Sequence, residues 1–188
     1  MKKIIIVGVG ALGSHVAMML RNVAQLKLID HDRVEAKNTL SQFHGKPSLG
    51  KNKAQALQQS LQFMFGLKTE VIPHRLVSAN TEILNGYDLV LDCLDNGASR
   101  RLVQAHVRAK QTPCLHGALA AGGAFGRVVW DEAFEVDDET PGVPTCEDGG
   151  QLPFICVVSS LLARAAQEFL KSGKKTGYEI NPRGVIST

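Results

Sequence analysis

The stretch KIIIVGVGALG, residues 3–13, decides the fold. Its four successive apolar residues, 4–7, are typical of a strand that is buried on both faces of a sheet. The glycines at positions 8, 10 and 13 follow with the spacing GxGxxG. The apolar pattern of residues 11–22 then predicts a helix. A strand that passes through such a turn into a helix is typical of the first unit of a Rossmann-like sheet.

Strands and helices alternate along the rest of the chain. Further apolar runs predict strands at 26–30, 68–73, 88–92 and 113–118, and helical spacing predicts helices at 51–65, 97–109 and 153–171. Residues 125–130 predict an antiparallel strand, and 177–184 an edge strand. We therefore expect an α/β fold: a doubly wound, mostly parallel sheet with helices on both faces and a C-terminal antiparallel extension.

Length and composition favour one domain spanning residues 1–188. Residues 131–148 hold eight acids and no Lys or Arg, so we expect 131–152 to form a mobile acidic crossover loop. The four cysteines form no CxxC pair, which predicts neither zinc nor a disulfide framework. Glycines and His15 interrupt the apolar N-terminal stretch, so we expect a cytoplasmic protein that inserts in no membrane; no DNA partner is expected.

The glycine loop predicts a nucleotide site. Gly8, Gly10 and Gly13 let the backbone turn tightly and approach a phosphate, and the helix that starts at Ala11 and Leu12 offers unpaired N–H groups to an anion. Asp30 ends the next strand, about 20 residues on, where a carboxylate can bind the ribose hydroxyls of an adenine nucleotide. ATP and NAD both satisfy this pattern.

Two expected helices begin with cations, although the N-terminus of a helix normally favours acids. Lys51 and Lys53 open one helix, and Arg100 and Arg101 lie in the first turn of another. Helix N-termini face the ligand crevice of a doubly wound sheet, so these cations favour a triphosphate. We expect Lys53 and Arg100 to be ligand-facing, and Lys51 and Arg101 to reach solvent.

The stretch LDCLDN, residues 91–96, ends a predicted strand in two acids. This strand should lie beside the strand that feeds the glycine loop, so we expect Asp95 to hold Mg²⁺ on the phosphates. Leu94 and Asn96 flank it and are assigned to the same site. Asp92, nearer the strand body, is expected to bond only backbone N–H groups, and Cys93 to be a small core residue.

These motifs resemble the ThiF/MoeB/HesA family, the bacterial relatives of ubiquitin-activating enzymes. The likeness covers most of residues 3–172, and LVLDCLDN followed by Arg100 is its most specific part. By that resemblance Asp30 binds ribose, Asn38 and Lys53 bind phosphates, and Asp95 holds Mg²⁺. Residues assigned to the same nucleotide site on this basis include Asp32 and Gln42.

The resemblance implies an ATP-dependent adenylyltransferase. The C-terminal carboxylate of a ubiquitin-like or sulfur-carrier β-grasp protein would attack the α-phosphate, with Lys53, Asp95 and Arg100 as catalytic groups and a homodimer as the assembly. Cys146 matches the cysteine that links to the carrier in sulfur-transfer members, and covalent and non-covalent roles both stay open. One departure concerns Ser41, which stands where many members have an arginine, so that Lys46, Arg33 or a partner subunit would have to supply the cation.

Three alternatives remain at this point. The glycine loop and Asp30 also suit an NAD-dependent dehydrogenase, although 188 residues leave little room for a substrate domain. A non-catalytic nucleotide sensor would need the Rossmann-like half alone. Within the family, a small carboxylate or a tRNA-linked substrate is a further candidate. The sequence does not identify the carrier, and it does not separate sulfur transfer from protein conjugation.

Overall fold

The computed structural model describes residues 1–120, 122–136 and 149–188. Within these residues one sheet has eight strands in the order β3-β2-β1-β4-β5-β6-β7-β8. The strands are β1 (Lys3–Val7), β2 (Gln25–Ile29), β3 (Glu70–Ile72), β4 (Leu89–Asp92), β5 (Cys114–Leu119), β6 (Gly126–Trp130), β7 (Tyr178–Asn181) and β8 (Gly184–Ser187). Strands β1 to β5 are parallel, whereas β6, β7 and β8 join by antiparallel pairing.

Strand β1 lies at the point where the chain reverses its direction of travel across the sheet. The chain moves outward from β1 to β2 and β3, and then returns to β4 on the other side of β1. In such sheets ligands bind beyond the carboxyl ends of the strands at this switch point. The fold therefore predicts a ligand site at the carboxyl ends of β1 and β4.

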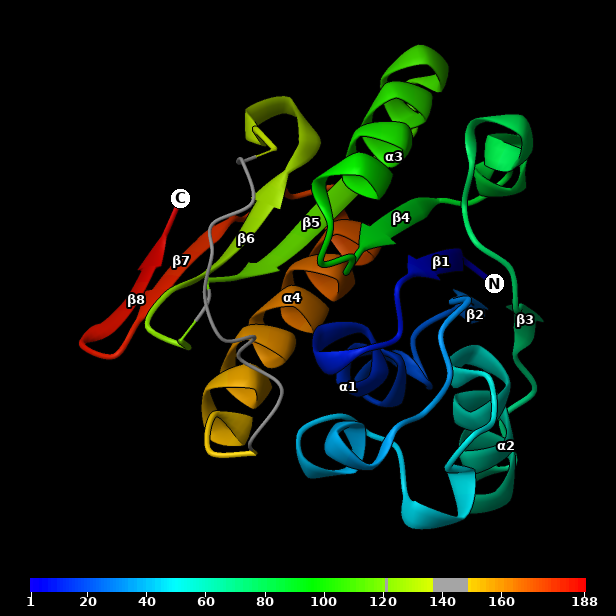
Figure 1. Ribbon diagram of the computed structural model, residues 1–188. Coiled ribbons are helices and arrows are strands. Elements are labelled where there is room, and N and C mark those ends of the chain that lie inside the picture. Colours follow the sequence, from blue (N-terminus) through cyan, green and yellow to red (C-terminus); the bar gives the residue numbers. More distant parts are fainter. Residues whose placement is uncertain (121, 137–148) are drawn as a thin grey trace.

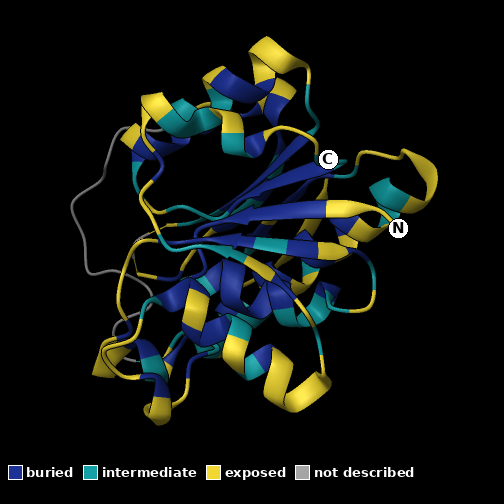
Figure 2. Ribbon diagram, turned by 90° about the vertical axis from the view of Figure 1, so that its right-hand side faces the viewer, coloured by how far each residue is buried: buried dark blue, intermediate teal, exposed yellow. Residues whose placement is uncertain are grey.

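Helices cover both faces of the sheet (Figures 1 and 2). The longer helices are α1 (Ala11–Leu20), α2 (Lys53–Phe65), α3 (Gly97–Lys110) and α4 (Leu152–Ser172), and the 3₁₀ helices are η1 (Ala36–Leu40), η2 (Lys46–Ser48), η3 (Ser78–Leu84) and η4 (Asp131–Ala133). Helices α1, α2 and α4 pack on one face against Ile4 and Ile6, while α3 and η3 pack on the other against Ile5 and Val7. Successive strand residues point to opposite faces, so the apolar run of β1 serves both cores.

The predicted fold class is confirmed, including the antiparallel C-terminal strands. The structure differs from the expectation in the short 3₁₀ helices η1 to η4 and in the tail. The segment between β2 and α2 forms η1 and η2, which have no sequence period that predicts them. The tail forms a hairpin of two strands, β7 and β8, where we expected one edge strand.

Helix α4 is long and apolar enough to cross a membrane by length and composition alone. Its apolar stripe nevertheless packs into the main core through Ile155, Val158, Leu162 and Ala166. A core helix of a globular domain passes the same composition test, so the packing of α4 accounts for its hydrophobicity.

Candidate nucleotide-binding site

The glycine loop and the end of β4 are in direct contact. Val7 and Asp92 are register partners in the parallel pair β1–β4, and Cys93 N donates to Val7 O at 2.9 Å. A Cβ atom at Gly8 would lie 2.9 Å from Cys93 O, and Gly8 has φ +85°. Only glycine fits there, because both the conformation and the approach of Cys93 exclude a side chain.

The three glycines of the motif meet different constraints. A Cβ at Gly13 would lie 1.9 Å from Gly8 O, so Gly13 is required where α1 passes the turn. A Cβ at Gly10 would meet nothing closer than the Gln42 side chain at 3.8 Å. Gly10, beside the N-terminus of α1, is therefore not required by steric crowding, and a methyl group there would be in ordinary contact with Gln42. The side chains of Ala11 and Leu12 pack on the core, so only their backbone N–H groups are candidates for contact with a phosphate.

Asp30 supports the glycine loop from the end of β2. One carboxylate oxygen accepts from Val9 N at 2.8 Å, and the other accepts from Asp32 N at 2.9 Å. Burial raises the pKa of Asp30, while the charge of Lys53 and the two backbone N–H groups act in the opposite direction. The carboxylate is thus fixed beside the loop, and its remaining lone pairs are the candidates for binding ribose.

Lys53 is buried at the start of α2, and its Nζ lies 3.2 Å from Asp32 Oδ2; its contact with a phosphate stays a prediction. The charge of Lys53 acts to lower the pKa of both Asp30 and His44, which bond Val9 N and Val9 O of the glycine loop. Lys51 and Arg101 are exposed, as we expected. Asp32 is half exposed, so the pair with Lys53 is accessible from solvent.

The segment 38–44 is held against the start of α1 by hydrogen bonds that the sequence does not predict. Phe43 N donates to Ser14 Oγ at 2.9 Å, His15 Nε2 bonds Ser41 O at 3.0 Å, and His44 Nε2 bonds Val9 O at 3.0 Å. Burial lowers the pKa of His44, which favours the neutral ring. The sequence predicts the histidines only as structural or surface residues. The contact of His44 with Val9 depends on the fold, because the two residues are 35 positions apart.

Two residues of this segment that we predicted to bind the nucleotide have different surroundings. Asn38 is buried, and its Oδ1 accepts from Glu35 N at 2.8 Å, so it holds the start of η1. Gln42 is also buried, and within the described residues its Oε1 has no hydrogen-bond partner. A buried, unpaired acceptor is costly, so Gln42 is a natural contact for a ligand with a donor.

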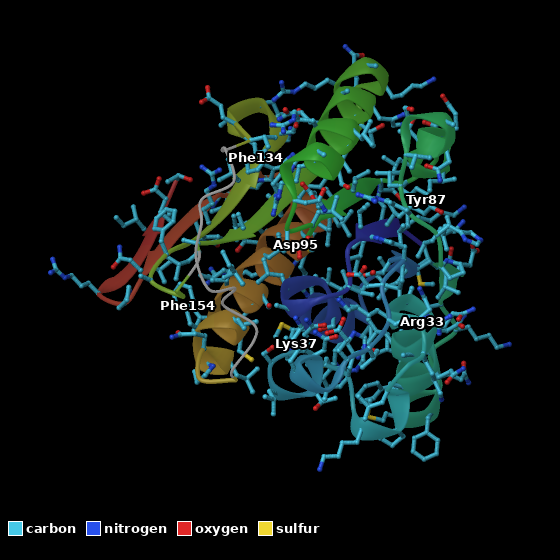
Figure 3. The ribbon with its side chains drawn as sticks, viewed as in Figure 1. Arg33, Lys37, Tyr87, Asp95, Phe134 and Phe154 are labelled. Carbon is cyan, nitrogen blue, oxygen red and sulfur yellow. The ribbon has the colours of Figure 1, made fainter. Side chains whose placement is uncertain are left out.

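Asp95 lies exposed where β4 has ended, at the base of α3 (Figure 3). Its Oδ1 accepts a hydrogen bond of 3.4 Å from Asn96 Nδ2. Asn96 caps α3, because its Oδ1 accepts from Ser99 N at 2.9 Å. Leu94 N donates to Asp92 Oδ1 at 3.0 Å, which fixes the turn that presents Asp95.

The expectation that Asp92 bonds only backbone N–H groups is wrong. Its Oδ2 lies 3.1 Å from Arg100 Nη1 and 2.7 Å from His116 Nδ1. Burial opposes the charge on Asp92, but Arg100, His116 and the Leu94 N–H outweigh it and lower its pKa. Arg100 is buried, and its Nη2 donates to Leu94 O and to Gly117 O. These contacts hold the end of β4, and a direct phosphate contact of Arg100 stays a prediction.

The predicted nucleophile Cys146 and residues 137–148 of the acidic stretch lie outside the described residues. Burial raises the pKa of Cys93, Cys114 and Cys156. The thiolate is the nucleophilic form of cysteine, so these three thiols are poorly suited to nucleophilic chemistry.

A separate cavity of about 480 Å³ lies between α3 and the segment after β6. Its lining is Arg101, Gln104, Arg108 and residues 132–136, with no contribution from the glycine loop. The region at the ends of β1 and β4 is the better candidate site, because the constrained glycines, the fixed acid and the unpaired acceptor lie there.

The sequence and the fold are both similar to those of known proteins. The ThiF family model matches residues 1–183. "Probable adenylyltransferase/sulfurtransferase MoeZ" of Mycobacterium tuberculosis is 28% identical over 181 residues, covering 87% of this chain and 46% of MoeZ. "Adenylyltransferase and sulfurtransferase UBA4" of Lodderomyces elongisporus is 32% identical over 194 residues, covering 96% of this chain and 42% of UBA4. The chain thus spans less than half the length of these two relatives.

The match covers a larger share of a third relative. The "Sulfur carrier protein adenylyltransferase" of Thermus thermophilus is 31% identical over 193 residues, covering 89% of this chain and 68% of that protein. Among solved structures, E. coli MccB with AMPCPP and MccA has a TM-score of 0.82 at 15% identity, covering 100% of this chain and 63% of MccB. PaaA has a TM-score of 0.76 at 16% identity, covering 100% of this chain and 62% of PaaA. At these identities the structures show the shared fold alone, whereas the match of the family model over residues 1–183 is decisive: the chain belongs to the ThiF family.

Proposed function

We propose that this chain adenylates the C-terminal carboxylate of a ubiquitin-like or sulfur-carrier β-grasp protein with ATP. The relatives named above are adenylyltransferases and sulfurtransferases, and one is named as acting on a sulfur carrier protein. The observation in this chain that carries the proposal is the setting of Gly10, where a Cβ would meet only the Gln42 side chain, at 3.8 Å. Gly10 lies at the N-terminus of α1, next to the fixed carboxylate of Asp30 and the unpaired Oε1 of Gln42.

The N-terminus of α1 suits the phosphates of ATP. The first N–H groups of a helix have no partner within the helix, and its dipole favours an anion there. Lys53 adds a positive charge near the loop, and its present partner Asp32 is half exposed. In this arrangement Asp30 binds the ribose, and the amide of Gln42 contacts the nucleotide beside Gly10.

The reaction needs positioning more than proton transfer. A carboxylate oxygen of the carrier forms a bond to the α-phosphorus, and the bond from that phosphorus to the bridging oxygen breaks, releasing pyrophosphate with its electron pair. A carboxylate is already a nucleophile at neutral pH, so no general base is required. Negative charge grows on the phosphate oxygens, and fixed cations and N–H groups stabilise it.

Asp95 is the residue that we assign to Mg²⁺. Mg²⁺ is commonly bound by one or two carboxylates together with substrate phosphates, and an exposed carboxylate beside the glycine loop fits that pattern. The metal would neutralise charge on the phosphates. Asp30, His31 and Asp32 also place ligand atoms within 4.8 Å of one another. The carboxylate oxygens of Asp30 accept backbone N–H groups and Asp32 pairs with Lys53, so Asp95 is the better ligand.

The position of Ser41 leaves one cation to be assigned. Ser41 is buried, and its carbonyl bonds His15. Arg33 Nη1 donates to Gly50 O at 2.6 Å, which holds Arg33 on the loop before α2. Lys46 is exposed at the start of η2. We propose that Lys46 or a residue of a partner subunit in a homodimer supplies the missing charge.

Several features of the whole protein belong to the same proposal. We propose a cytoplasmic location and a single adenylation domain, with transfer through Cys146 as a second step. The identity of the carrier, and the choice between sulfur transfer and protein conjugation, are the next questions.

Mass spectrometry tests the proposal. The protein is incubated with ATP, Mg²⁺ and candidate small β-grasp proteins, and the expected product is a carrier that bears an added AMP. Asp95→Asn should lose that product while it still folds, because Asp95 is exposed. Glu179→Gln on β7 is the matched control, since Glu179 is an exposed acid outside the crevice. If no carrier gains AMP, or if Asp95→Asn retains full activity, the proposal is wrong.

A further inference from the structure

A second cluster of charges lies behind the end of β4, centred on His116 of β5. His116 has no exposed surface, its Nδ1 lies 2.7 Å from Asp92 Oδ2, and its Nε2 lies 3.1 Å from Asp131 Oδ1. Asp92 is the last residue of β4, and Asp131 is the first of η4. One ring therefore bridges two elements whose acids are far apart in sequence.

The geometry decides the protonation state of this ring. A neutral imidazole has one N–H, whereas the imidazolium donates at both nitrogens, and an ionised carboxylate can only accept. Two carboxylates facing the two ring nitrogens therefore require the charged ring. Burial opposes that charge, but the hydrogen bonds to Asp131 and Asp92 outweigh it, and the pKa of His116 is raised.

The titratable and charged groups around His116 come from β4, β5, η4 and α3. Arg100 and Arg108 of α3 pair with Asp92 and Asp131 respectively, at 3.1 and 2.8 Å. Cys114 Sγ, on the same strand, lies 3.5 Å from His116 Nε2. Each carboxylate thus has an arginine partner on α3 as well as His116, and Asp131 also accepts from Gln104 Nε2 at 3.2 Å. Among the described residues, His116 is the side chain that contacts both acids directly.

Phe134 covers this network on the side of η4. Its ring stacks on His116 with centroids 4.0 Å apart, and the guanidinium of Arg100 lies 5.4 Å from the Phe134 centroid. Figure 3 shows Phe134 beside α3. Arg100 in turn bonds Leu94 O, in the turn that presents Asp95. The network therefore links η4 and Phe134 to the turn that carries the proposed metal ligand.

We propose that His116 is a positioning residue, whose imidazolium fixes η4 and Phe134 against the end of β4 and so holds the turn that presents Asp95. Loss of its proton leaves one N–H for two acceptors. The ring lies closer to Asp92, at 2.7 Å, than to Asp131, at 3.1 Å, so the link to Asp131 is the one that breaks. The catalytic consequence rests on the proposed function: Mg²⁺-dependent ATP binding should weaken as the pH rises through the pKa of His116.

Histidine NMR tests the structural half without any ligand. His116→Gln assigns the resonance, and His106→Gln is the matched control, because His106 is also buried but bonds the neutral amide of Asn85 at 2.9 Å. We expect His116 to titrate above its ordinary value of 6.5. In parallel, the hydrogen-exchange protection factor of the Phe134 amide should fall at the same midpoint. A pKa at or below 6.5 would overturn the proposal.

Asp131→Asn supplies a rescue that a merely structural role would not predict. An asparagine amide can donate to a neutral ring, so the bridge should survive at high pH and the pH dependence of Phe134 protection should disappear. If that dependence persists in Asp131→Asn, the bridge is not the cause and the proposal fails.

The functional half uses ATP with Mg²⁺ as the probe, titrated from acid to alkaline pH. Affinity of the wild type should fall above the pKa of His116, whereas His116→Gln should bind with a flat pH profile and about tenfold more weakly at low pH, the effect of one hydrogen bond to a charged group. An alkaline loss of affinity that is unchanged in His116→Gln would contradict the role. If no variant binds ATP, the proposed function fails, while the NMR and exchange results still decide whether His116 forms the bridge.

Discussion

Some glycines of the candidate site are required by the fold, whereas another is not. Gly8 and Gly13 are required by the backbone around them, because a Cβ at either position would clash with Cys93 O or Gly8 O. The surroundings of Gly10 contain no such clash. The same motif therefore contains two glycines that the fold requires and one that it does not, and we propose that the third serves the phosphate.

This difference predicts how two alanine substitutions behave. Gly13→Ala should lower the free energy of unfolding by several kcal/mol, because its Cβ would lie 1.9 Å from Gly8 O. Gly10→Ala should cost clearly less stability but abolish measurable ATP binding, because the added methyl group fills the space for the phosphate. Urea unfolding and calorimetric titration with ATP measure the two effects. Equal destabilisation by both substitutions would contradict this division.

At the residue scale the sequence predicted positions better than partners. Lys51 and Arg101 are exposed, as predicted, whereas Lys53 and Arg100 are buried and their contact with a ligand stays a prediction. The partner of Asp92 was missed because His116 is 24 residues away and meets Asp92 only through the pairing of β4 with β5. Spacing along a sequence carries no information on a contact that depends on strand order.

At the scale of elements, helix caps place the residues of the site. Asn52 and Asn96 are the N-cap residues of α2 and α3, and each accepts a hydrogen bond from the backbone three residues on. Asn52 Nδ2 also donates to Asp30 O at 2.8 Å. The cap of α2 therefore ties the helix that carries Lys53 to the strand end that carries Asp30.

The cap of α3 provides a test at this scale. Asn96→Ala should lower the free energy of unfolding by about 1 kcal/mol, the usual effect of losing an N-cap side chain. Asn96→Asp should restore it, because a carboxylate can accept the same hydrogen bond from Ser99 N. Thermal and urea unfolding provide the measurement. If Asn96→Asp is as unstable as Asn96→Ala, the side chain does not act as a cap.

The sequence predicted the strands and long helices well because their apolar periods are strong. Strand β1 is continuously apolar, and α4 repeats its apolar residues at helical spacing between Pro153 and Gly173. The short helices η1 and η2 lack a period, and hydrogen bonds such as that from Ser48 N to Gly45 O define them. The strand β8 was missed because all its residues are exposed, which leaves no hydrophobic pattern.

For the whole molecule, two buried histidines should give stability a pH dependence with opposite signs. The pKa of His116 is raised, so its contribution is present below pH 6.5 and is lost as the pH rises through the folded value. Burial lowers the pKa of His44, so its contribution is present above pH 6.5 and is lost as the pH falls through the folded value. Stability should therefore decline on both sides of a maximum.

Single substitutions separate the two contributions. His116→Gln should flatten the alkaline side of the stability profile, and His44→Gln should flatten the acid side. Urea unfolding at several pH values on each side of neutrality measures both slopes. An unchanged alkaline slope in His116→Gln, or an unchanged acid slope in His44→Gln, would show that other groups control the pH dependence.

For the whole molecule, we propose that the strand order brings the glycine loop, Asp30, Lys53 and Asp95 to one ATP-binding site. Calorimetric titration of the purified protein with ATP and Mg²⁺, and separately with NAD, tests this claim most directly. We expect saturable binding of ATP that Gly10→Ala abolishes, and we expect Asp95→Asn to remove the dependence of that binding on Mg²⁺. Binding of NAD with no response to ATP would contradict it.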